Sequence, residues 1–290
     1  MTPFDTLRRL RSCTGWLSAA LGLLAVTAVT GGTAAQENTR QDVDVALVLA
    51  VDISYSMDID EQRLQRQGYM QAITSPDVLE AIRGGLTGSI AVTYVEWAGT
   101  LSRSVLVDWH VVSDEASAQR FADALGEAPI SRAYRTAIGD ALLFSAQQFA
   151  SMPHRAARKV IDISGDGPNN QGTYAPAARD QVVAQGIVIN GLPLQLKDVR
   201  PGWFDMADLD RYYETCVIGG PGSFIVPVRG AERFAEAVRR KLVLEIAMPA
   251  LPQPRKLREA PVIRVAEGID PFCLEGERRW QQRRFIYEDP

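Results

Sequence analysis

The hydrophobic and polar positions of the chain follow two different periods between residues 43 and 247. Continuous apolar runs rich in Val, Ile and Leu predict buried strands, whereas apolar residues three and four positions apart predict amphipathic helices. The strands are expected at 43–51, 89–97, 102–109, 159–163, 187–194 and 224–228. The helices are expected at 59–74, 76–83, 114–126, 136–149, 175–185, 207–214 and 230–247.

Strands and helices alternate through most of this region. The alternation predicts an α/β fold with a doubly wound, mostly parallel sheet and helices on both faces. The strands at 89–97 and 102–109 follow one another closely enough to form a hairpin, so we expect one antiparallel edge strand. Residues 43–247 are therefore expected to form the folded domain.

The residues before this domain have the pattern of a secretory signal peptide. An arginine-rich start is followed by the apolar stretch Trp16–Val29, which is too short to span a bilayer comfortably, and then by small residues up to Ala35. We expect cleavage after Ala35, removal of residues 1–35, and a secreted or periplasmic protein with no membrane span left. The alternative is a signal anchor that stays in the membrane.

Two segments flank the expected domain. Residues 36–42 are polar and are expected to form a linker. Residues 248–290 are rich in proline at first and then become charged and aromatic. This composition predicts an extended C-terminal tail, which could include a short strand at Val262–Val265.

The composition is that of an ordinary globular protein. The chain has 290 residues, of which 46% are hydrophobic and 23% are charged, and its net charge is −4. Nucleic-acid binding requires a basic surface that neutralises phosphates, so this mild acidity argues against a nucleic-acid partner.

The cysteines allow one disulfide in the mature chain. Cys13 lies within the expected signal peptide, so that Cys216 and Cys273 remain. In an oxidising compartment an even number of cysteines favours pairing, and only one intramolecular pair is possible here. The alternative is two unpaired thiols. A Cys216–Cys273 disulfide would tie the tail to the domain.

The candidate chemistry begins where the first strand ends. Asp52, Ser54 and Ser56 follow the apolar run at alternate positions. The carboxyl end of a strand in an open α/β sheet delivers its next side chains to the crevice where ligands bind. One carboxylate and two hydroxyls are hard oxygen donors, which suit a hard divalent cation such as Mg²⁺.

Two later segments place oxygen donors at equivalent points. Thr136 opens a predicted helix, and Asp166 follows the strand at 159–163. A doubly wound sheet would bring both residues to the same edge as Asp52. The alternative is that Asp52, Ser54 and Ser56 only form a turn and a helix cap, because Asp and Ser are preferred N-cap residues.

These motifs resemble the metal-ion-dependent adhesion site of von Willebrand factor type A domains, in which Asp-x-Ser-x-Ser is joined by a later Thr and by an Asp in a Gly-Asp-Gly turn. The resemblance covers about residues 43–247. Further motifs resemble a bacterial family of secreted type A domains with no assigned function. They are found at 94–97, 163–170, 190–193 and 217–222.

The resemblance implies a role for each of the five residues. Ser54 and Ser56 would bind Mg²⁺, or alternatively Mn²⁺ or Ca²⁺, directly. Asp52 and Asp166 would act mostly through water, and Thr136 would bind when the site is engaged. Related domains usually have glycine before this threonine, whereas this chain has Arg135, which could alter the backbone or pair with an incoming carboxylate.

The function expected from the resemblance is that of a protein-binding module, not an enzyme. Its metal would capture an Asp or Glu side chain of a partner protein. One alternative is a metal-dependent hydrolase or phosphotransferase, but Ser54 stands where such enzymes need a second carboxylate, and Lys159 lies at the start of its strand and not at its carboxyl end. The other alternative is a structural envelope scaffold whose metal only orders the loops.

Two polar runs have simpler interpretations. Asn169 and Asn170 are expected to be turn residues, since asparagine favours turns. The run Arg239-Arg240-Lys241 is expected on the solvated face of the last helix of the domain.

Overall fold

The computed structural model describes residues 41–196, 206–248 and 270–288. Its contacts divide the chain into two units, Met1–Thr39 and Arg40–Pro290, and all described residues belong to the second unit. The expected signal peptide, most of the linker and the short strand at Val262–Val265 lie outside the described residues, so these stay predictions.

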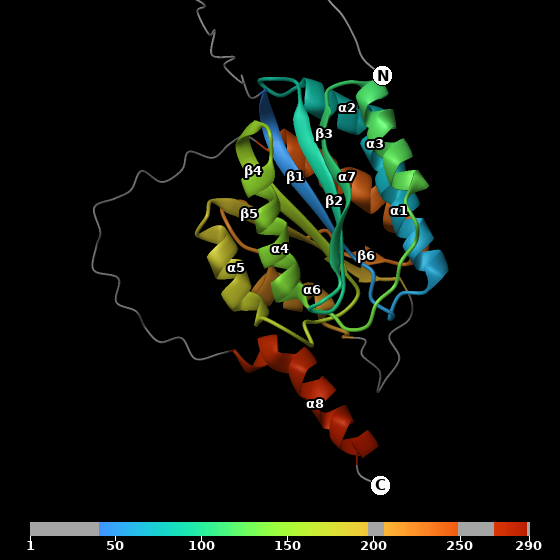
Figure 1. The fold of residues 1–290 in the computed structure, drawn as a ribbon, viewed down its shortest axis with the longest axis vertical. Helices are drawn as coiled ribbons and strands as arrows, with labels where there is room; N and C mark the ends of the chain where they lie inside the picture. The colour runs from blue at the N-terminus through green and yellow to red at the C-terminus, as the bar shows by residue number, and fades with distance from the viewer. Residues whose placement is uncertain (1–40, 197–205, 249–269, 289–290) are drawn as a thin grey trace, which may run out of the picture. The chain divides into compact units, whose positions relative to one another are not determined.

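A single six-stranded sheet forms the centre of the fold, with the strand order β3-β2-β1-β4-β5-β6. All neighbouring strands are parallel except β2 and β3, which are antiparallel. This confirms the predicted fold, including the antiparallel edge strand (Figure 1). The strands are β1 (Asp42–Asp52), β2 (Ile90–Trp97), β3 (Arg103–Val112), β4 (Arg155–Gly165), β5 (Ile187–Gln195) and β6 (Val228–Arg229).

Helices pack on both faces of the sheet through two separate hydrophobic cores. Figure 1 shows α4 across one face and α7 behind the other. The first core contains residues of α1 (Ile59–Ile73), α2 (Pro76–Arg83), α3 (Glu115–Glu127) and α7 (Phe234–Ala247). The second contains residues of α4 (Ile138–Ser151), α5 (Ala175–Val183), α6 (Leu209–Tyr212) and the π-helical turn η1 (Tyr213–Val217).

Strand β1 shows why the central apolar run is continuous. Leu47 and Leu49 pack into the first core, while Val48 and Ala50 pack into the second. A strand covered on both faces needs apolar residues at every position, not at alternate ones. The run therefore ends only at the carboxyl edge of the sheet, where Asp52 is the last residue of β1.

The expectation of an extended tail is wrong for the described part of the C-terminal segment. A short helix, η3 (Pro271–Leu274), leads directly into α8 (Glu275–Glu288). Asp270 caps this start by accepting a hydrogen bond from the Phe272 N–H, and Glu275 forms ion pairs with two arginines one turn later. Polar helices lack apolar periodicity, so the pattern did not reveal α8.

The Cys216–Cys273 disulfide is present, which confirms that pairing. It joins η1 to η3, and both cysteines are buried. The last strand is shorter than expected, because only Val228 and Arg229 pair with β5, while Ile225 forms an isolated bridge to Gly191. Among the described residues, no helix combines the length and the apolar content needed to cross a membrane.

Candidate metal centre

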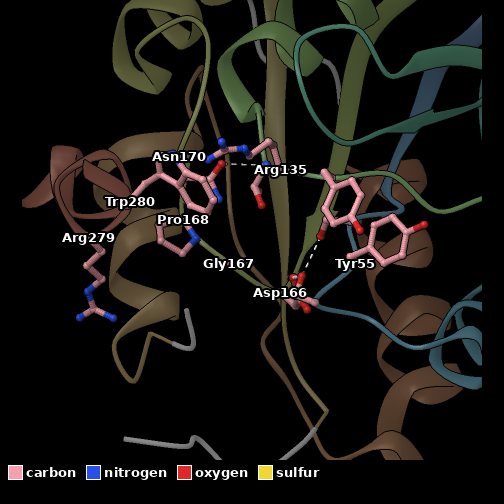
Figure 2. Close-up of a pocket in the computed structure, with 13 residues that line it drawn as sticks. Tyr55, Arg135, Asp166, Gly167, Pro168, Asn170, Arg279 and Trp280 are labelled. Carbon is pink, nitrogen blue, oxygen red and sulfur yellow. Dashed lines mark hydrogen bonds between the residues drawn. The ribbon is translucent and has the colours of Figure 1, made fainter. Parts of the chain in front are cut away.

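A pocket of about 390 Å³ opens where β1 and β4 end. Figure 2 shows Asp166 at this pocket, with Tyr55 on one side and with Arg135 and Trp280 on the other. Four of the five predicted metal ligands line it, and they are Ser54, Ser56, Thr136 and Asp166. The structure therefore brings three distant segments of the chain to one edge of the sheet, as the topology predicts.

A row of oxygen atoms connects the end of β1 to the loop after β4. The Oγ atoms of Ser54 and Ser56 lie 2.8 Å apart. The Ser56 hydroxyl donates a hydrogen bond to Oδ1 of Asp166 at 2.7 Å. These three side chains are therefore within reach of one small ligand.

Asp52 lies behind this row and is fully buried. Its Oδ1 accepts a hydrogen bond from the Ser54 N–H at 2.7 Å, while its Oδ2 has no hydrogen-bond partner among the described residues. Burial, followed by the negative charge of Asp166, raises the pKa of Asp52 well above its ordinary value. The site thus holds two carboxylates whose charges repel each other.

Gly165 makes room for this arrangement. A Cβ atom at Gly165 would lie 2.8 Å from the Tyr213 hydroxyl and 2.9 Å from Oδ2 of Asp52, so a larger residue would force both groups to move. The Tyr213 hydroxyl is buried and has no hydrogen-bond partner in the described part of the chain. Burial, Asp52 and Asp166 all raise the pKa of Tyr213.

Hydrogen bonds of its backbone hold Thr136 beside the pocket. Its N–H donates to Oδ1 of Asn170 at 3.0 Å, and the Asn170 N–H donates to the Thr136 carbonyl at 2.8 Å. This pair of bonds ties the loop before α4 to the loop that carries Asp166. Thr136 itself is 5% exposed.

Arg135 has an unusual backbone. Its φ is 80°, and it is the one non-glycine residue with positive φ in the described ranges. The resemblance implies a glycine at this position, and glycine adopts positive φ without a steric penalty. For arginine, such a backbone costs about 1–3 kcal/mol, which the surrounding contacts must offset.

Asn169 and Asn170 lie in a turn as expected, but their side chains also connect the site. Asn169 is fully buried. Its Oδ1 accepts from the Gly139 N–H at the start of α4, and its Nδ2 donates to Oε1 of Glu277 at 2.7 Å. These long-range partners could not be predicted from the sequence, because turn propensity and burial are independent properties.

The C-terminal segment supplies residues that the sequence did not place at the site. Gly276, Arg279 and Trp280 of α8 line the pocket. The Arg135 guanidinium lies 3.1 Å from the centre of the Trp280 ring (Figure 2). The one sequence signal for this contact was the cysteine pair, which predicted that the tail is tied to the domain.

The geometry places Lys159, the lysine considered for an aspartyl-phosphate enzyme, far from Asp52. Lys159 pairs with Ala46 near the amino end of β1, and Asp52 lies at the opposite end of that strand, about 20 Å away. Within the described residues, no group of three or more His, Cys, Asp and Glu side chains is placed to hold a metal. The expected donors are different, since they combine two carboxylates with three hydroxyls.

The sheet order and the loops at its carboxyl edge define a von Willebrand factor type A-like fold. The structure is similar to the pilus adhesin SpaC from Lactobacillus rhamnosus GG, with a TM-score of 0.53 and 13% identity over 72% of this chain and 31% of that chain. It is also similar to proximal thread matrix protein 1 from the mussel byssus with a zinc-occupied MIDAS motif, with a TM-score of 0.50 and 14% identity over 70% of this chain and 46% of that chain.

A von Willebrand factor type A protein from Catenulispora acidiphila also matches, with a TM-score of 0.47 and 16% identity over 70% of this chain and 43% of that chain. The chain thus spans less than half the length of each of these proteins. No curated protein matches this sequence. Residues 42–250 match the family described as "Protein of unknown function (DUF1194)", and the chain belongs to that family.

Proposed function

We propose that this edge of the sheet binds a divalent cation and uses it to capture a carboxylate of a partner protein. The observation that carries the proposal is the hydrogen-bonded row from Ser54 through Ser56 to Asp166. The Oδ2 atom of Asp52 lies behind it without a partner among the described residues. Buried polar atoms normally have partners, so an unpaired carboxylate oxygen calls for an explanation.

The donor set suits a hard cation. Ser54, Ser56 and Asp166 would hold it, with Asp52 and Thr136 completing the oxygen donors. Carboxylate and hydroxyl oxygens suit Mg²⁺, and also Mn²⁺ or Ca²⁺. Burial raises the pKa of Asp52 and the charge of Asp166 adds to this rise, so a cation would also relieve the repulsion between the two carboxylates. When bound, it offers a positive charge that can accept an external carboxylate.

The surface beside the row is suited to a protein partner. Tyr134 is 74% exposed and Tyr55 is 45% exposed, and their rings stack with centroids 4.3 Å apart. The Arg132 guanidinium lies 4.5 Å from the centre of the Tyr55 ring. Tyrosine and arginine are enriched where interfaces bind most strongly. An exposed Asp or Glu of the partner, flanked by groups that pack on these rings, would therefore match the surface.

The proposed compartment is the periplasm or the extracellular space. The signal peptide expected at residues 1–35 is one support for it. The Cys216–Cys273 disulfide is another, since stable disulfides belong mainly to oxidising compartments. Comparing the N-terminal residue of the exported protein with Gln36 would test cleavage after Ala35.

Calorimetric titration of the mature protein with Mg²⁺ tests the metal site directly. Ser56→Ala removes the central hydroxyl of the row and is expected to weaken Mg²⁺ binding by about tenfold or more. Ser151→Ala, which changes an exposed serine at the end of α4, is the matched control and is expected to bind like the wild type. Equal affinities for all three proteins would contradict the proposal.

Partner capture separates the binding module from the scaffold alternative. The immobilised mature protein is expected to retain a partner from envelope extract in Mg²⁺ and to release it in chelator, and Ser56→Ala is expected to retain none. If Mg²⁺ binds and raises the melting temperature but no partner depends on it, the structural scaffold is the better account.

A further inference from the structure

The C-terminal segment (Asp270–Glu288) lies against the candidate metal centre, although it follows the residues that match the family. The Cys216–Cys273 disulfide fixes its start to η1. The Phe272 ring contacts the Tyr212 ring, with centroids 6.2 Å apart. The segment is therefore held at its first turn by a covalent bond and by packing.

The segment also touches the loop that carries Asp166. A Cβ atom at Gly276 would collide with the carbonyl oxygen of Asn169, so glycine is what allows α8 to approach this backbone. The next residue, Glu277, accepts the hydrogen bond from Nδ2 of Asn169. Asn169 in turn accepts from the N–H of Gly139 in the first turn of α4. These contacts connect α8 to both loops of the site.

Arg135 provides the second connection. Its guanidinium stacks on Trp280, and its backbone adopts the left-handed conformation that arginine rarely occupies. The next residue is Thr136, whose N–H and carbonyl bond to Asn170. The conformation of Arg135 sets the direction in which the chain continues, and therefore where Thr136 lies relative to the pocket.

We propose that the C-terminal segment is a working part of the metal centre and that Trp280 is its positioning residue. By holding the Arg135 side chain, Trp280 keeps the strained backbone in place and Thr136 at the pocket. The disulfide keeps Trp280 docked. The effect of Trp280 on metal binding rests on the proposed function. Its effect on the conformation of the Thr136 loop does not, and it can be measured without metal.

A cycle of two substitutions in the full mature chain tests this. Trp280→Ala removes the ring, so the Arg135 backbone is expected to relax and the Thr136 amide to exchange its hydrogen about tenfold faster or more. Arg135→Gly needs no support, because glycine adopts positive φ freely. The double variant Arg135→Gly/Trp280→Ala is therefore expected to exchange like Arg135→Gly alone. Gln281→Ala, at an exposed position of α8, is the control.

Affinity for Mn²⁺ alone is the second readout, and it is expected to follow the same pattern. Trp280→Ala should lose about tenfold, and the double variant should recover that loss. Reduction of the disulfide should weaken binding in the wild type more than in Arg135→Gly. If Trp280→Ala weakened Mn²⁺ binding only through a loss of packing, the weaker binding would persist in the double variant.

Several results would overturn the inference. Unchanged exchange at Thr136 in Trp280→Ala would remove the positioning role, and so would faster exchange that Arg135→Gly does not correct. Altered exchange with unchanged Mn²⁺ affinity would show that the segment is not part of the metal centre. If the wild type binds no Mn²⁺ at all, the proposed function fails, while the exchange cycle still decides whether Trp280 holds the loop.

Discussion

Two clusters of carboxylates lie at different places in the fold, one at the carboxyl edge of the sheet and one between the sheet and α7. One is the candidate metal centre with Asp52 and Asp166. The other joins Asp162 of β4 to Lys241 and Glu245 of α7. The Lys241 Nζ atom lies 2.7 Å from Oδ1 of Asp162 and also pairs with Glu245. Both clusters contain two acidic side chains, and the second encloses Lys241.

The two clusters differ in the charges that act on the pKa of their buried aspartates. Burial raises the pKa of Asp52 and of Asp162 alike. At Asp162 the Lys241 ammonium opposes this rise, whereas at Asp52 the charge of Asp166 adds to it. One cluster therefore carries its own cation and is closed. Among the described residues, the other combines its carboxylates with the Ser54 and Ser56 hydroxyls beside a pocket, which is the arrangement that the proposed cation site requires.

Removing the internal cation is expected to have the largest effect on stability. Lys241→Met leaves Asp162 and Glu245 buried without their ammonium partner, which should cost about 3–5 kcal/mol in the free energy of unfolding. Arg240→Met, at the exposed neighbouring position, should change it by less than about 0.5 kcal/mol. Urea denaturation measures both. Similar costs for the two variants would show that the buried cluster is not held by its lysine.

The same cluster should make stability depend on pH. Burial and then Asp162 raise the pKa of Glu245 from 4.5 to about 7, so the folded state keeps a proton that the unfolded state has lost. This contribution is complete below pH 4.5 and is lost as the pH rises through 7, by roughly 3 kcal/mol. Glu245→Gln should make the decline shallower in urea denaturation across this range. An unchanged slope would contradict the assignment.

The metal centre should respond to an added ion instead. Mg²⁺ at about 100 times its dissociation constant should stabilise the wild type by about 2.7 kcal/mol, because the ion binds only the folded site. Asp166→Ala removes a donor and should abolish this gain in thermal melts. Asp123→Ala, at an exposed position of α3, should keep it. A Mg²⁺ effect that survives in Asp166→Ala would place the ion elsewhere.

Two neighbouring tyrosines give the smallest expected effects. The Tyr212 hydroxyl accepts a hydrogen bond from the buried Asn169 N–H at 3.2 Å, so Tyr212→Phe should cost about 1–3 kcal/mol. The Tyr213 hydroxyl faces Asp52 and has no hydrogen-bond partner in the described ranges, so Tyr213→Phe should change the free energy of unfolding by less than about 0.5 kcal/mol. Equal costs for the two variants in urea denaturation would mean that the Tyr213 hydroxyl is hydrogen-bonded as well as the Tyr212 hydroxyl is.

The sequence predicted the sheet because its strands and helices have clear periods. It misplaced Lys241, which was expected in solvent with Arg239 and Arg240 but is fully buried. Lys241 lies three and seven positions after the buried residues Val238 and Phe234, so helical periodicity places it on the apolar face. Its charge suggested the opposite, and its acidic partners, Asp162 on β4 and Glu245 on α7, explain its burial.

The candidate site was also predicted only in part from the sequence. The alternation after β1 and the topology together anticipated that Ser54, Ser56 and Asp166 would meet. Trp280 and Tyr213 could not be anticipated, since both arrive through contacts between segments far apart in the sequence. The sequence showed Arg135 where the resemblance implies glycine. Only the positive φ of Arg135 in the structure shows why this difference matters.

The most direct test of the account is a crystal of the mature protein grown with Mn²⁺, with the ion located by its anomalous scattering. The account predicts a peak at the pocket, within coordinating distance of the Ser54 and Ser56 hydroxyls and beside Asp166. No peak at this position in a protein saturated with Mn²⁺, or a peak bound by other residues, would contradict it.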